Sequence, residues 1–204
     1  MHYDVLIIGG GVSGVSCALV LGSALTKPYA QGKTVAILTH QKATALQDAV
    51  FYNAYGIRPG TLGSELMTSS LEHLSSEYPA VTQLPNEKVL SILPGNHFTV
   101  TTNKNVYTAA CIVVAVGSAN TFMIEGLMEY VIPHQKAAPE KNRIQLSNSD
   151  HLVRPNLYVA GTLAGHRSQL SIAAGSGAAV ATDILTMWNE GKQSQSHDSI
   201  RSRA

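Results

Sequence analysis

The N-terminal third of the chain alternates apolar runs with segments of helical spacing. Residues 3–8 form a continuous run of β-branched residues and Leu, which is typical of a parallel strand buried on both faces. Glycines end this run, apolar residues then recur at helical spacing up to Lys27-Pro28, and a second apolar run covers residues 34–38. This succession predicts a β-α-β unit.

Further along, the spacing of the apolar residues changes from helical to alternating. Apolar residues three and four positions apart predict an amphipathic helix that ends near Pro79. Runs with a period of two follow, separated by turn-forming clusters. We expect a small antiparallel meander with strands at 89–93, 98–102 and 106–116, the last of which enters the main sheet and stops at Gly117.

The last third of the chain completes the predicted fold. Residues 157–160 form another buried apolar run, and a long helical pattern covers 169–188. Residues 118–156 are irregular and contain three prolines, so we interpret them as a connector with a short strand near 143–146. The predicted fold class is α/β: one Rossmann-like domain over residues 1–188, with a central parallel sheet and an antiparallel meander. Residues 189–204 are rich in Ser and Gln, and we expect a flexible polar tail there.

Composition narrows the classes of partner. The 204 residues carry 14 Lys and Arg against 13 Asp and Glu, and the charged fraction of 13% is low compared with the usual share of roughly 25%. No extended basic field is available for nucleic acid or an anionic membrane. No uninterrupted apolar run approaches the roughly 20 residues of a membrane helix, and the N-terminus has no signal-peptide pattern. We expect a cytoplasmic protein without nucleic-acid or membrane partners.

A glycine motif directly follows the first strand. Gly9, Gly11 and Gly14 form G-x-G-x-x-G between a strand and a helix, the context that gives this pattern meaning. Gly9 allows the tight turn, Gly11 lets a pyrophosphate approach the backbone, and Gly14 permits close packing of helix on strand. The helix N-terminus that begins with Val12 and Ser13 offers free N–H groups to phosphates. The motif predicts a dinucleotide site.

The end of the second strand departs from the usual dinucleotide pattern. An Asp or Glu normally holds a ribose hydroxyl there, whereas this chain has Thr39 and His40. Either side chain can hydrogen-bond a ribose, but a carboxylate is the stronger, charged acceptor. We therefore expect the adenosine end of the ligand to be held more loosely than usual.

Four stretches in a fixed order resemble the flavoprotein half of the thioredoxin reductases and their low-molecular-weight relatives. The first is the glycine motif with its preceding strand. The second, N-A-Y-G followed by G-S-E-L-M, is similar to the family's N-x-P-G and G-P-E-L-M segment, and the third, I-V-V-A-V-G, is similar to the strand that ends in A-T-G. The fourth resembles the A-G-D strand end and the start of the last helix. These stretches lie at 4–14, 53–67, 112–117 and 157–177.

The resemblance implies FAD as the cofactor. In the family, the start of the last helix points at the flavin O2 and stabilises the negative charge that accumulates there on reduction, and Asn53 of this chain should touch the isoalloxazine ring. FAD domains of the family commonly pair, so a homodimer is a further expectation. From the glycine motif and the resemblance together, the candidate cofactor-binding residues are Gly9, Gly11, Val12, Ser13, Gly14, Thr39, His40, Asn53, Gly117, Gly161, Thr162, Gln169 and Leu170.

The chain also departs from the family pattern. Tyr55 and Ser64 stand where prolines are usual, and Val116 replaces Thr. Thr162 replaces the Asp of A-G-D, so one charge-assisted hydrogen bond to the cofactor becomes a neutral one. In two-domain members an NADPH domain, usually with a C-x-x-C pair, lies where this chain has only residues 118–156. The resemblance therefore implies a flavin domain without its nicotinamide domain.

No dithiol is available for exchange with a disulfide. Cys17 and Cys111 lie far apart in apolar stretches, which suits buried thiols in a reducing compartment. Thiol–disulfide exchange needs a thiolate placed to attack, so thioredoxin reductase activity is not expected of this chain.

Catalytic residues remain unassigned from the sequence. The loop residues Tyr52, Tyr55, His134, His166 and Arg167 lie near motifs and are candidates, and a cation at His166 or Arg167 could support an anionic reduced flavin. The eight histidines show no metal-ligand spacing, so we expect no metal. Ser13 and Ser176 do not lie in G-x-S-x-G, and a serine nucleophile is not supported.

Three hypotheses for the function follow. The first is an FAD-dependent oxidoreductase whose electrons come from a partner protein or from free reduced nicotinamide. The second is a non-catalytic flavin- or dinucleotide-binding module that senses redox state or scaffolds a complex. The third is a nucleotide-binding protein of the thiazole-biosynthesis type, which shares the glycine fingerprint and also lacks a second nucleotide domain.

Overall fold

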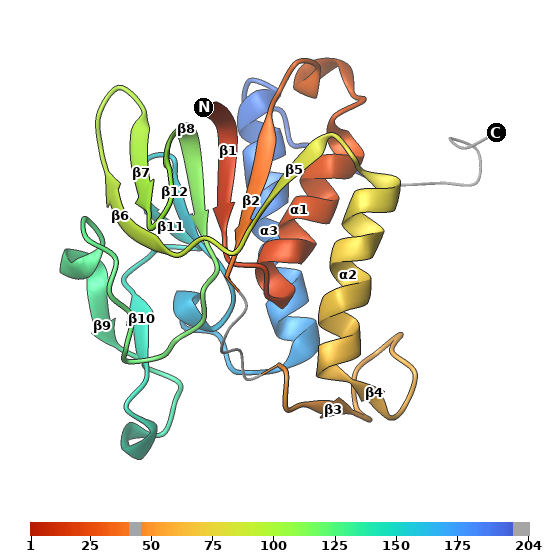
Figure 1. The fold of residues 1–204 in the computed structure, drawn as a ribbon, viewed down its shortest axis with the longest axis vertical. Helices are drawn as coiled ribbons and strands as arrows, with labels where there is room; N and C mark the ends of the chain where they lie inside the picture. The colour runs from red at the N-terminus through yellow and green to blue at the C-terminus, as the bar shows by residue number, and fades with distance from the viewer. Residues whose placement is uncertain (41–45, 198–204) are drawn as a thin grey trace.

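The computed structural model describes residues 1–40 and 46–197, which form three layers. A central sheet separates three helices from a β-meander and a small hairpin (Figure 1). The predicted fold class, a single α/β Rossmann-like domain with a central, mostly parallel sheet, is confirmed.

The central sheet consists mainly of parallel strands. Its order is β11-β12-β8-β1-β2-β5, and every pair is parallel except β11 with β12. Continuous apolar runs form the middle strands because both faces are covered, and Val5, Leu6 and Ile7 of β1 are fully buried. The strands are β1 (His2–Ile8), β2 (Val35–Thr39), β5 (Val81–Pro85), β8 (Val106–Val114), β11 (Leu152–Arg154) and β12 (Leu157–Val159).

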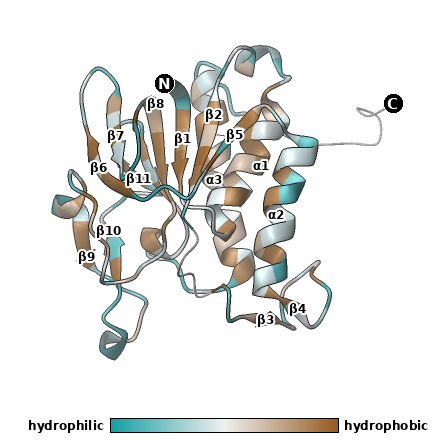
Figure 2. Cartoon of the chain, viewed as in Figure 1, coloured by the Kyte–Doolittle hydropathy of each residue, from teal (hydrophilic) through white to brown (hydrophobic). Residues whose placement is uncertain are grey.

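Three helices cover one face of this sheet. They are α1 (Val12–Ala24), α2 (Gly63–Glu77) and α3 (Leu170–Trp188). The core on this face joins apolar side chains of α1 and α3 to those of β1, β2 and β8. In Figure 2 the central strands carry hydrophobic colours, whereas α2 carries hydrophilic segments on its outer side.

The meander covers the opposite face. β6 (Val89–Leu93) pairs with β7 (Phe98–Thr102), which pairs in turn with β8, both in antiparallel register. Apolar side chains of these strands pack on Tyr3, Leu6 and Ile8 of β1. The predicted meander is therefore present, with its last strand inside the main sheet.

The connector contains more regular structure than the sequence predicted. β9 (Val131–Pro133) and β10 (Ile144–Leu146) form a small antiparallel hairpin. Short 3-10 helices cover Met128–Tyr130 and Pro139–Lys141. The predicted short strand near 143–146 is confirmed as β10, whereas β9 and β11 were not expected within this irregular stretch.

Strands were also missed in the first half of the chain. β5 was missed because Thr82 and Gln83 break its apolar run, and it becomes a strand by pairing with the buried strand β2. β3 (Val50–Phe51) and β4 (Thr61–Leu62) pair with each other and are too short to leave a periodic signal.

The segment after α3 differs from the expected free tail. Ser194 is buried, its amide donates to Thr186 Oγ1 at 3.1 Å, and Asn189 Nδ2 donates to Ser194 Oγ at 2.9 Å. Ser23 of α1 reaches Ser196 at 2.9 Å. Hydrogen bonds of Ser194 to the end of α3 and of Ser196 to α1 therefore hold part of residues 189–197 against these helices. Residues 198–204 lie outside the described part of the chain.

α3 is long and apolar enough, by length and composition, to cross a membrane. In this fold one side of it packs on α1 and on the sheet, where Val180, Ala181, Ile184 and Leu185 are fully buried. The apolar character of α3 is therefore explained by its place in the core.

A buried carboxylate ties the meander to the chain that enters it. Glu87 accepts hydrogen bonds from Thr102 Oγ1 at 2.6 Å, Tyr107 OH at 2.7 Å and Asn105 Nδ2 at 2.8 Å. Burial alone would raise the pKa of Glu87, but these donors, led by Thr102, outweigh it and hold the pKa below its ordinary value. Burial and the bond to Glu87 raise the pKa of Tyr107 to about 12.

We predict that Glu87→Ala lowers the free energy of unfolding by about 2–4 kcal/mol at pH 7, because three donors lose a charged acceptor. A pKa lowered by folding stabilises the protein above the ordinary carboxyl pKa, and this contribution disappears as the pH falls through the folded-state pKa. Urea denaturation between pH 3 and 7 measures both effects. Glu72→Ala, on the exposed side of α2, is the control and should change stability by no more than about 0.5 kcal/mol. Equal urea midpoints for the two variants at pH 7 would contradict the prediction.

Candidate functional site

The candidate site lies at the edge of the sheet where the parallel strands end. β1 lies between β8 and β2, and the chain moves to opposite sides of β1 when it forms these two neighbours. Open α/β sheets bind ligands at such a switch point, outside the carboxyl ends of the strands. Gly9, Thr39, Gly117 and Gly161 follow or end these strands, so the register brings most of the predicted residues to one edge.

The glycine loop has the geometry that its sequence predicts. Gly9 has a φ of +116°, and a Cβ there would overlap the carbonyl oxygen of Ala115. A Cβ at Gly14 would overlap the carbonyl oxygen of Gly9, so α1 approaches the strand as closely as a backbone permits. By contrast, a Cβ at Gly11 would have no atom within 4 Å. The loop is therefore closed toward the protein at Gly9 and Gly14 and open at Gly11.

A second close backbone contact joins α1 to α3. A Cβ at Gly177 would overlap the carbonyl oxygen of Ser13, and a Cβ at Gly161 would overlap the Ser13 hydroxyl. Ser16 Oγ donates a hydrogen bond to Ala174 O at 2.8 Å. We call the contact among Ser13, Gly161 and Gly177 the helix crossing. It sets the first turn of α1 against the third turn of α3.

Both helix N-termini are open toward an anion. The N-cap residues Gly11 and Gln169 make no side-chain cap hydrogen bond, and neither first turn contains an acidic residue. First-turn N–H groups have no intrahelical acceptor, and the helix dipole adds positive potential at this end. The two turns together form an environment that favours negative charge.

A cavity of about 200 Å³ opens beside these two turns. Its walls come from α1, α2, the start of α3 and the segment around β3 and β4, and most of them are apolar. The residues around it are Gly10, Gly11, Val12, Val15, Ser16, Leu19, Leu46, Ile57, Leu66, Met67, Ser70, Leu170 and Ala174. A flat, largely apolar ring is the kind of group that fits such a wall.

The remaining predicted binding residues surround this edge. Thr39 is buried and its carbonyl accepts from Asn86 N at 2.7 Å, while His40 is exposed. Gly117 has a φ of +83° and open space at its Cβ position. Thr162 lies in a 3-10 turn (Gly161–Ala164) directly after β12.

The segment that carries Asn53 borders the site rather than entering its core. Asn53 is exposed, between β3 and β4, and Ile57 of the same segment lines the cavity. The candidates Tyr52 and Tyr55 are largely exposed and do not reach the strand ends. Arg167 is likewise exposed, just before α3.

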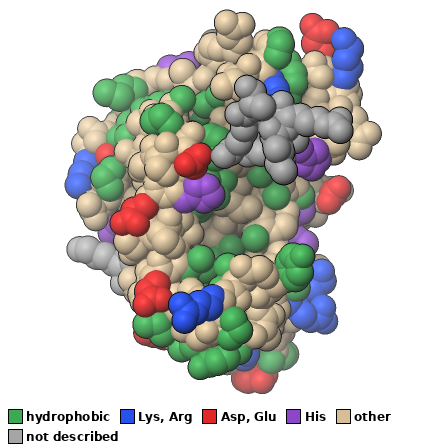
Figure 3. All heavy atoms as spheres, turned by 90° about the vertical axis from the view of Figure 1, so that its right-hand side faces the viewer, with side chains coloured by type: hydrophobic (Ala, Val, Ile, Leu, Met, Phe, Trp, Pro, Cys, Tyr) green, Lys and Arg blue, Asp and Glu red, His purple; other side chains and the backbone are tan. Residues whose placement is uncertain are grey.

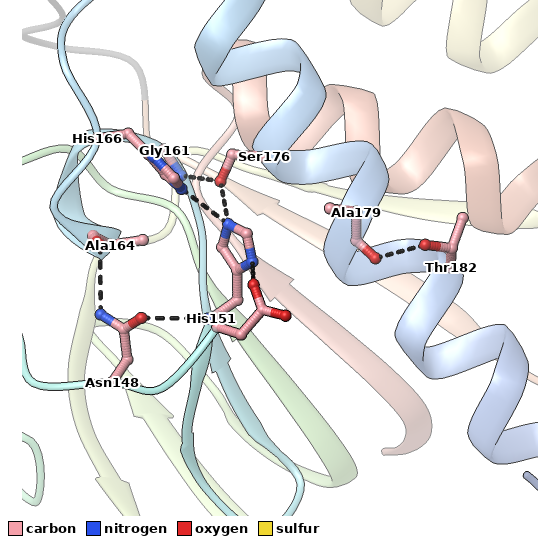
Figure 4. A network of polar contacts seen from close by, with 9 residues as sticks. Asn148, His151, Gly161, Ala164, His166, Ser176, Ala179 and Thr182 are labelled. Atoms are coloured by element: carbon pink, nitrogen blue, oxygen red, sulfur yellow. Dashed lines mark hydrogen bonds and ion pairs between the residues drawn. The ribbon is translucent and has the colours of Figure 1, made fainter.

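His166 belongs to a polar network that the sequence did not reveal. Its Nε2 lies 2.9 Å from Nε2 of His151, which also lies 3.0 Å from Ser176 Oγ (Figure 4). Ser176 accepts a hydrogen bond from the Gly161 amide at 2.8 Å. On its other side, His151 Nδ1 lies 3.6 Å from Asp150 Oδ1. Residues from α3, the 3-10 turn after β12 and two loops therefore meet at Gly161.

Neighbouring contacts fix this network to the connector. Asn148 Nδ2 donates to Ala164 O at 3.3 Å, and its Oδ1 accepts from the His151 amide at 3.1 Å (Figure 4). His151 and Asp150 have positive φ angles of +71° and +47°. A turn of this kind has little periodicity, which is why sequence patterns did not single out His151.

The arrangement of Ser176, His151 and Asp150 resembles a hydrolytic triad but lacks two of its requirements. Ser176 is buried, and its hydroxyl oxygen is occupied by the Gly161 amide. Asp150 is almost fully exposed, so it orients His151 only weakly. These three side chains therefore lack the accessible hydroxyl and the buried carboxylate of a hydrolytic triad.

His134, the last of the loop candidates, lies in the connector. It is buried, and its Nδ1 accepts from the Lys136 amide at 3.1 Å. Its position contributes to lowering the pKa of His166. The side chain of His134 therefore stabilises the turn in which it lies.

Both thiols are buried away from the site. Cys17 in α1 and Cys111 in β8 are free and inaccessible. Burial raises the pKa of Cys17 far above its ordinary value and that of Cys111 to about 12. A thiol with so high a pKa is a poor nucleophile, so neither cysteine replaces the missing dithiol.

The described residues contain no cluster of metal-ligating side chains. Within residues 1–40 and 46–197, no three His, Cys, Asp or Glu side chains are grouped so that they could hold a metal ion. The face in Figure 3 shows charges of both signs scattered over the surface. This distribution agrees with the low and balanced charge of the sequence.

Comparison with known proteins gives one family and one fold. Residues 3–176 match the sequence profile of the pyridine nucleotide-disulphide oxidoreductases. A thioredoxin reductase from Gloeobacter violaceus superposes with a TM-score of 0.74 at 14% identity, covering 97% of this chain and 98% of that one. A search of the curated proteins finds no match.

Two other similar structures show how widely this fold occurs. A ferredoxin-flavin thioredoxin reductase from Clostridium acetobutylicum superposes with a TM-score of 0.66 at 17% identity, over 93% of this chain and 99% of that one. A GidA-related protein from Thermus thermophilus superposes with a TM-score of 0.63 at 15% identity, over 91% and 99%. At these identities the likeness establishes the fold alone.

The helix crossing predicts opposite effects for two glycines of α3. Gly177→Ala must push α3 away from the Ser13 carbonyl, and we expect a loss of about 2 kcal/mol or more in the free energy of unfolding. Gly175→Ala, two residues earlier and open to space, should gain up to about 1 kcal/mol from helix propensity. Thermal and urea denaturation of both variants test this, and a Gly177→Ala protein as stable as the wild type would contradict the crossing.

Proposed function

Because the chain belongs to the pyridine nucleotide-disulphide oxidoreductase family, we propose that it is an FAD-dependent oxidoreductase built on the flavin-binding half of that family. Its family and fold are those of oxidoreductases. The observation that carries the proposal is the meeting of two uncapped helix N-termini with an open glycine loop at one sheet edge. A dinucleotide with two phosphates and a ring that becomes negatively charged on reduction matches both positive helix ends.

The described residues fit this cofactor at its diphosphate and at its ring. A Cβ at Gly11 would meet no protein atom within 4 Å, and the same holds at Gly117 after β8. Val12 and Ser13 begin the helix that would face the phosphates. Leu170 and the apolar cavity wall would lie against the ring.

The adenosine and ribityl ends would be held by neutral groups. Thr39 and His40 at the end of β2 replace a carboxylate for the ribose, and Thr162 replaces the Asp after β12. Asn53 and Gln169, both exposed at the rim, would contact the ring from two sides. Since neutral hydrogen bonds are weaker than charge-assisted ones, we expect FAD to dissociate more readily than from a protein with both carboxylates.

Electrons would come from outside the chain. Bound FAD would accept two electrons from a donor and pass them to an acceptor. Residues 118–156 occupy the place of a nicotinamide domain and form only a hairpin and short turns and strands. The electron donor is therefore a partner protein or free reduced nicotinamide that docks beside the exposed residues Asn53 and Gln169. A cytoplasmic location, with both cysteines as free thiols, and a homodimer belong to the same proposal.

A non-catalytic flavin-binding sensor or scaffold is the second candidate. This hypothesis is favoured because the candidate catalytic side chains Tyr52, Tyr55 and Arg167 are exposed to solvent. A thiazole-biosynthesis type of nucleotide-binding protein shares the glycine loop, and mass spectrometry of the small molecule that copurifies with the protein separates it from a flavoprotein.

We predict that the purified protein is yellow or becomes yellow with added FAD, and that Gly11→Ala weakens FAD binding by at least about tenfold. The new methyl group would occupy the space of the diphosphate, yet it meets no protein atom, so the fold should be unchanged. Equilibrium titration of the visible flavin spectrum gives the affinity, and circular dichroism checks the fold. Gly175→Ala is the matched control and should bind like the wild type. A wild-type protein that takes up no FAD would contradict the proposed function.

Turnover separates the enzyme from the sensor. Anaerobic stopped-flow mixing of the FAD-loaded protein with NADH, NADPH or a reduced ferredoxin should bleach the flavin absorbance, and oxygen or a quinone should restore it. Failure of every donor to bleach the flavin would favour the non-catalytic module.

A further inference from the structure

The contact between His151 and His166 requires one ring proton between the two Nε2 atoms, which lie 2.9 Å apart. The Asp150 carboxylate, 3.6 Å from His151 Nδ1, favours the tautomer of His151 that carries its proton on Nδ1. In that tautomer the lone pair of His151 Nε2 is an acceptor, and His166 Nε2 is the N–H donor. The Ser176 hydroxyl, which accepts from the Gly161 amide, lies 3.0 Å from the same nitrogen of His151.

This arrangement leaves one nitrogen for a further proton. Neutral His166 with its proton on Nε2 has a bare Nδ1, for which no hydrogen-bond partner exists among the described residues. His166 is partly exposed, whereas His151 is buried. A proton from solvent can therefore bind His166 Nδ1 while the Nε2–H···Nε2 contact to His151 is kept and becomes charge-assisted.

The surroundings keep this site neutral at rest. Burial, the neighbouring His151 and the positive charge of Lys136 lower the pKa of His166, with His134 acting in the same direction and Asp150 opposing it. Burial also lowers the pKa of His151. Burial and the nearby Asp150 raise the pKa of Asp183 on α3, so Asp183 contributes little fixed negative charge.

We propose that His166 is a proton-coupled positioning residue of the flavin site: it takes up one proton at Nδ1 when negative charge develops at the start of α3. His166 lies three residues before the N-cap Gln169, so the two are separated by at most about 11 Å of chain. Negative charge there favours the protonated imidazole. The cation formed is held in place by His151, which contacts Ser176 of α3, and Ser176 in turn accepts from the Gly161 amide after β12 (Figure 4).

This inference rests on the proposed function, because FAD is the group on which the charge would develop. The step is balanced without any further reactant. One proton leaves bulk water and binds His166 Nδ1, no covalent bond between heavy atoms changes, and the electrons come from the donor of the proposed reaction.

The test is a spectroelectrochemical titration of the FAD-loaded protein at a series of pH values, which counts the protons taken up per electron pair. We expect the wild type to take up about one proton more at pH 7 than the His166→Gln variant. Gln keeps an N–H donor for His151 but cannot bind the proton. His166 is partly exposed, so this substitution should fold, and the unchanged flavin spectrum of the loaded variant verifies it.

His97→Gln is the matched control. His97 contacts His2 with ring centroids 4.5 Å apart, at the opposite edge of the sheet where β1 begins. This variant should show the proton count of the wild type. A yellow His166→Gln protein with that same count overturns this inference alone, whereas a wild type that takes up no FAD overturns the proposed function and the inference with it.

Discussion

The whole site depends on a contact between backbones at the helix crossing. Ser13 of α1 lies against Gly177 of α3 and Gly161 after β12 so closely that neither glycine leaves room for a Cβ. Gly14 is held against Gly9 in the same way. The first turn of α1 therefore lies against the third turn of α3, and the starts of both helices line the same cavity, where their positive ends act together. Any side chain at these positions would separate the two ends and weaken the field between them.

The chemistry of this edge is mostly neutral, which sets it apart from the pattern its family resemblance implies. Thr39, His40 and Thr162 stand where acidic residues are expected. Neutral hydroxyl and imidazole groups at these positions form weaker hydrogen bonds than a carboxylate would, and they add no negative charge to this edge. Behind Thr162, the network of Gly161, Ser176 and His151 supplies the polar anchoring that the strand end would otherwise lack.

The connector, residues 118–156, supports the loop before α3 and stands where two-domain relatives would have a nicotinamide domain. Asn148 and His151 anchor the turn before α3, and Gly165 packs on Gln145, whose side chain also accepts from the Gln135 amide. Residues 118–156 thus brace the loop that leads to the last helix and contribute no second nucleotide fold in the part of the chain described here. Both thiols lie buried in the core, away from this loop.

The sequence by itself determined the elements whose signals are local. The apolar run of β1, the glycine spacing at Gly9, Gly11 and Gly14, and the helical pattern of α3 all depend on neighbouring residues, and the order of the motifs implied the family. Tertiary structure decided what depends on distant partners. β5 is a strand because β2 lies beside it, residues 189–197 are ordered because α1 and α3 offer hydrogen bonds, and His151 meets Ser176 across 25 positions of sequence. Periodicity records only which face of an element is apolar, whereas contacts between turns arise from the path of the whole backbone.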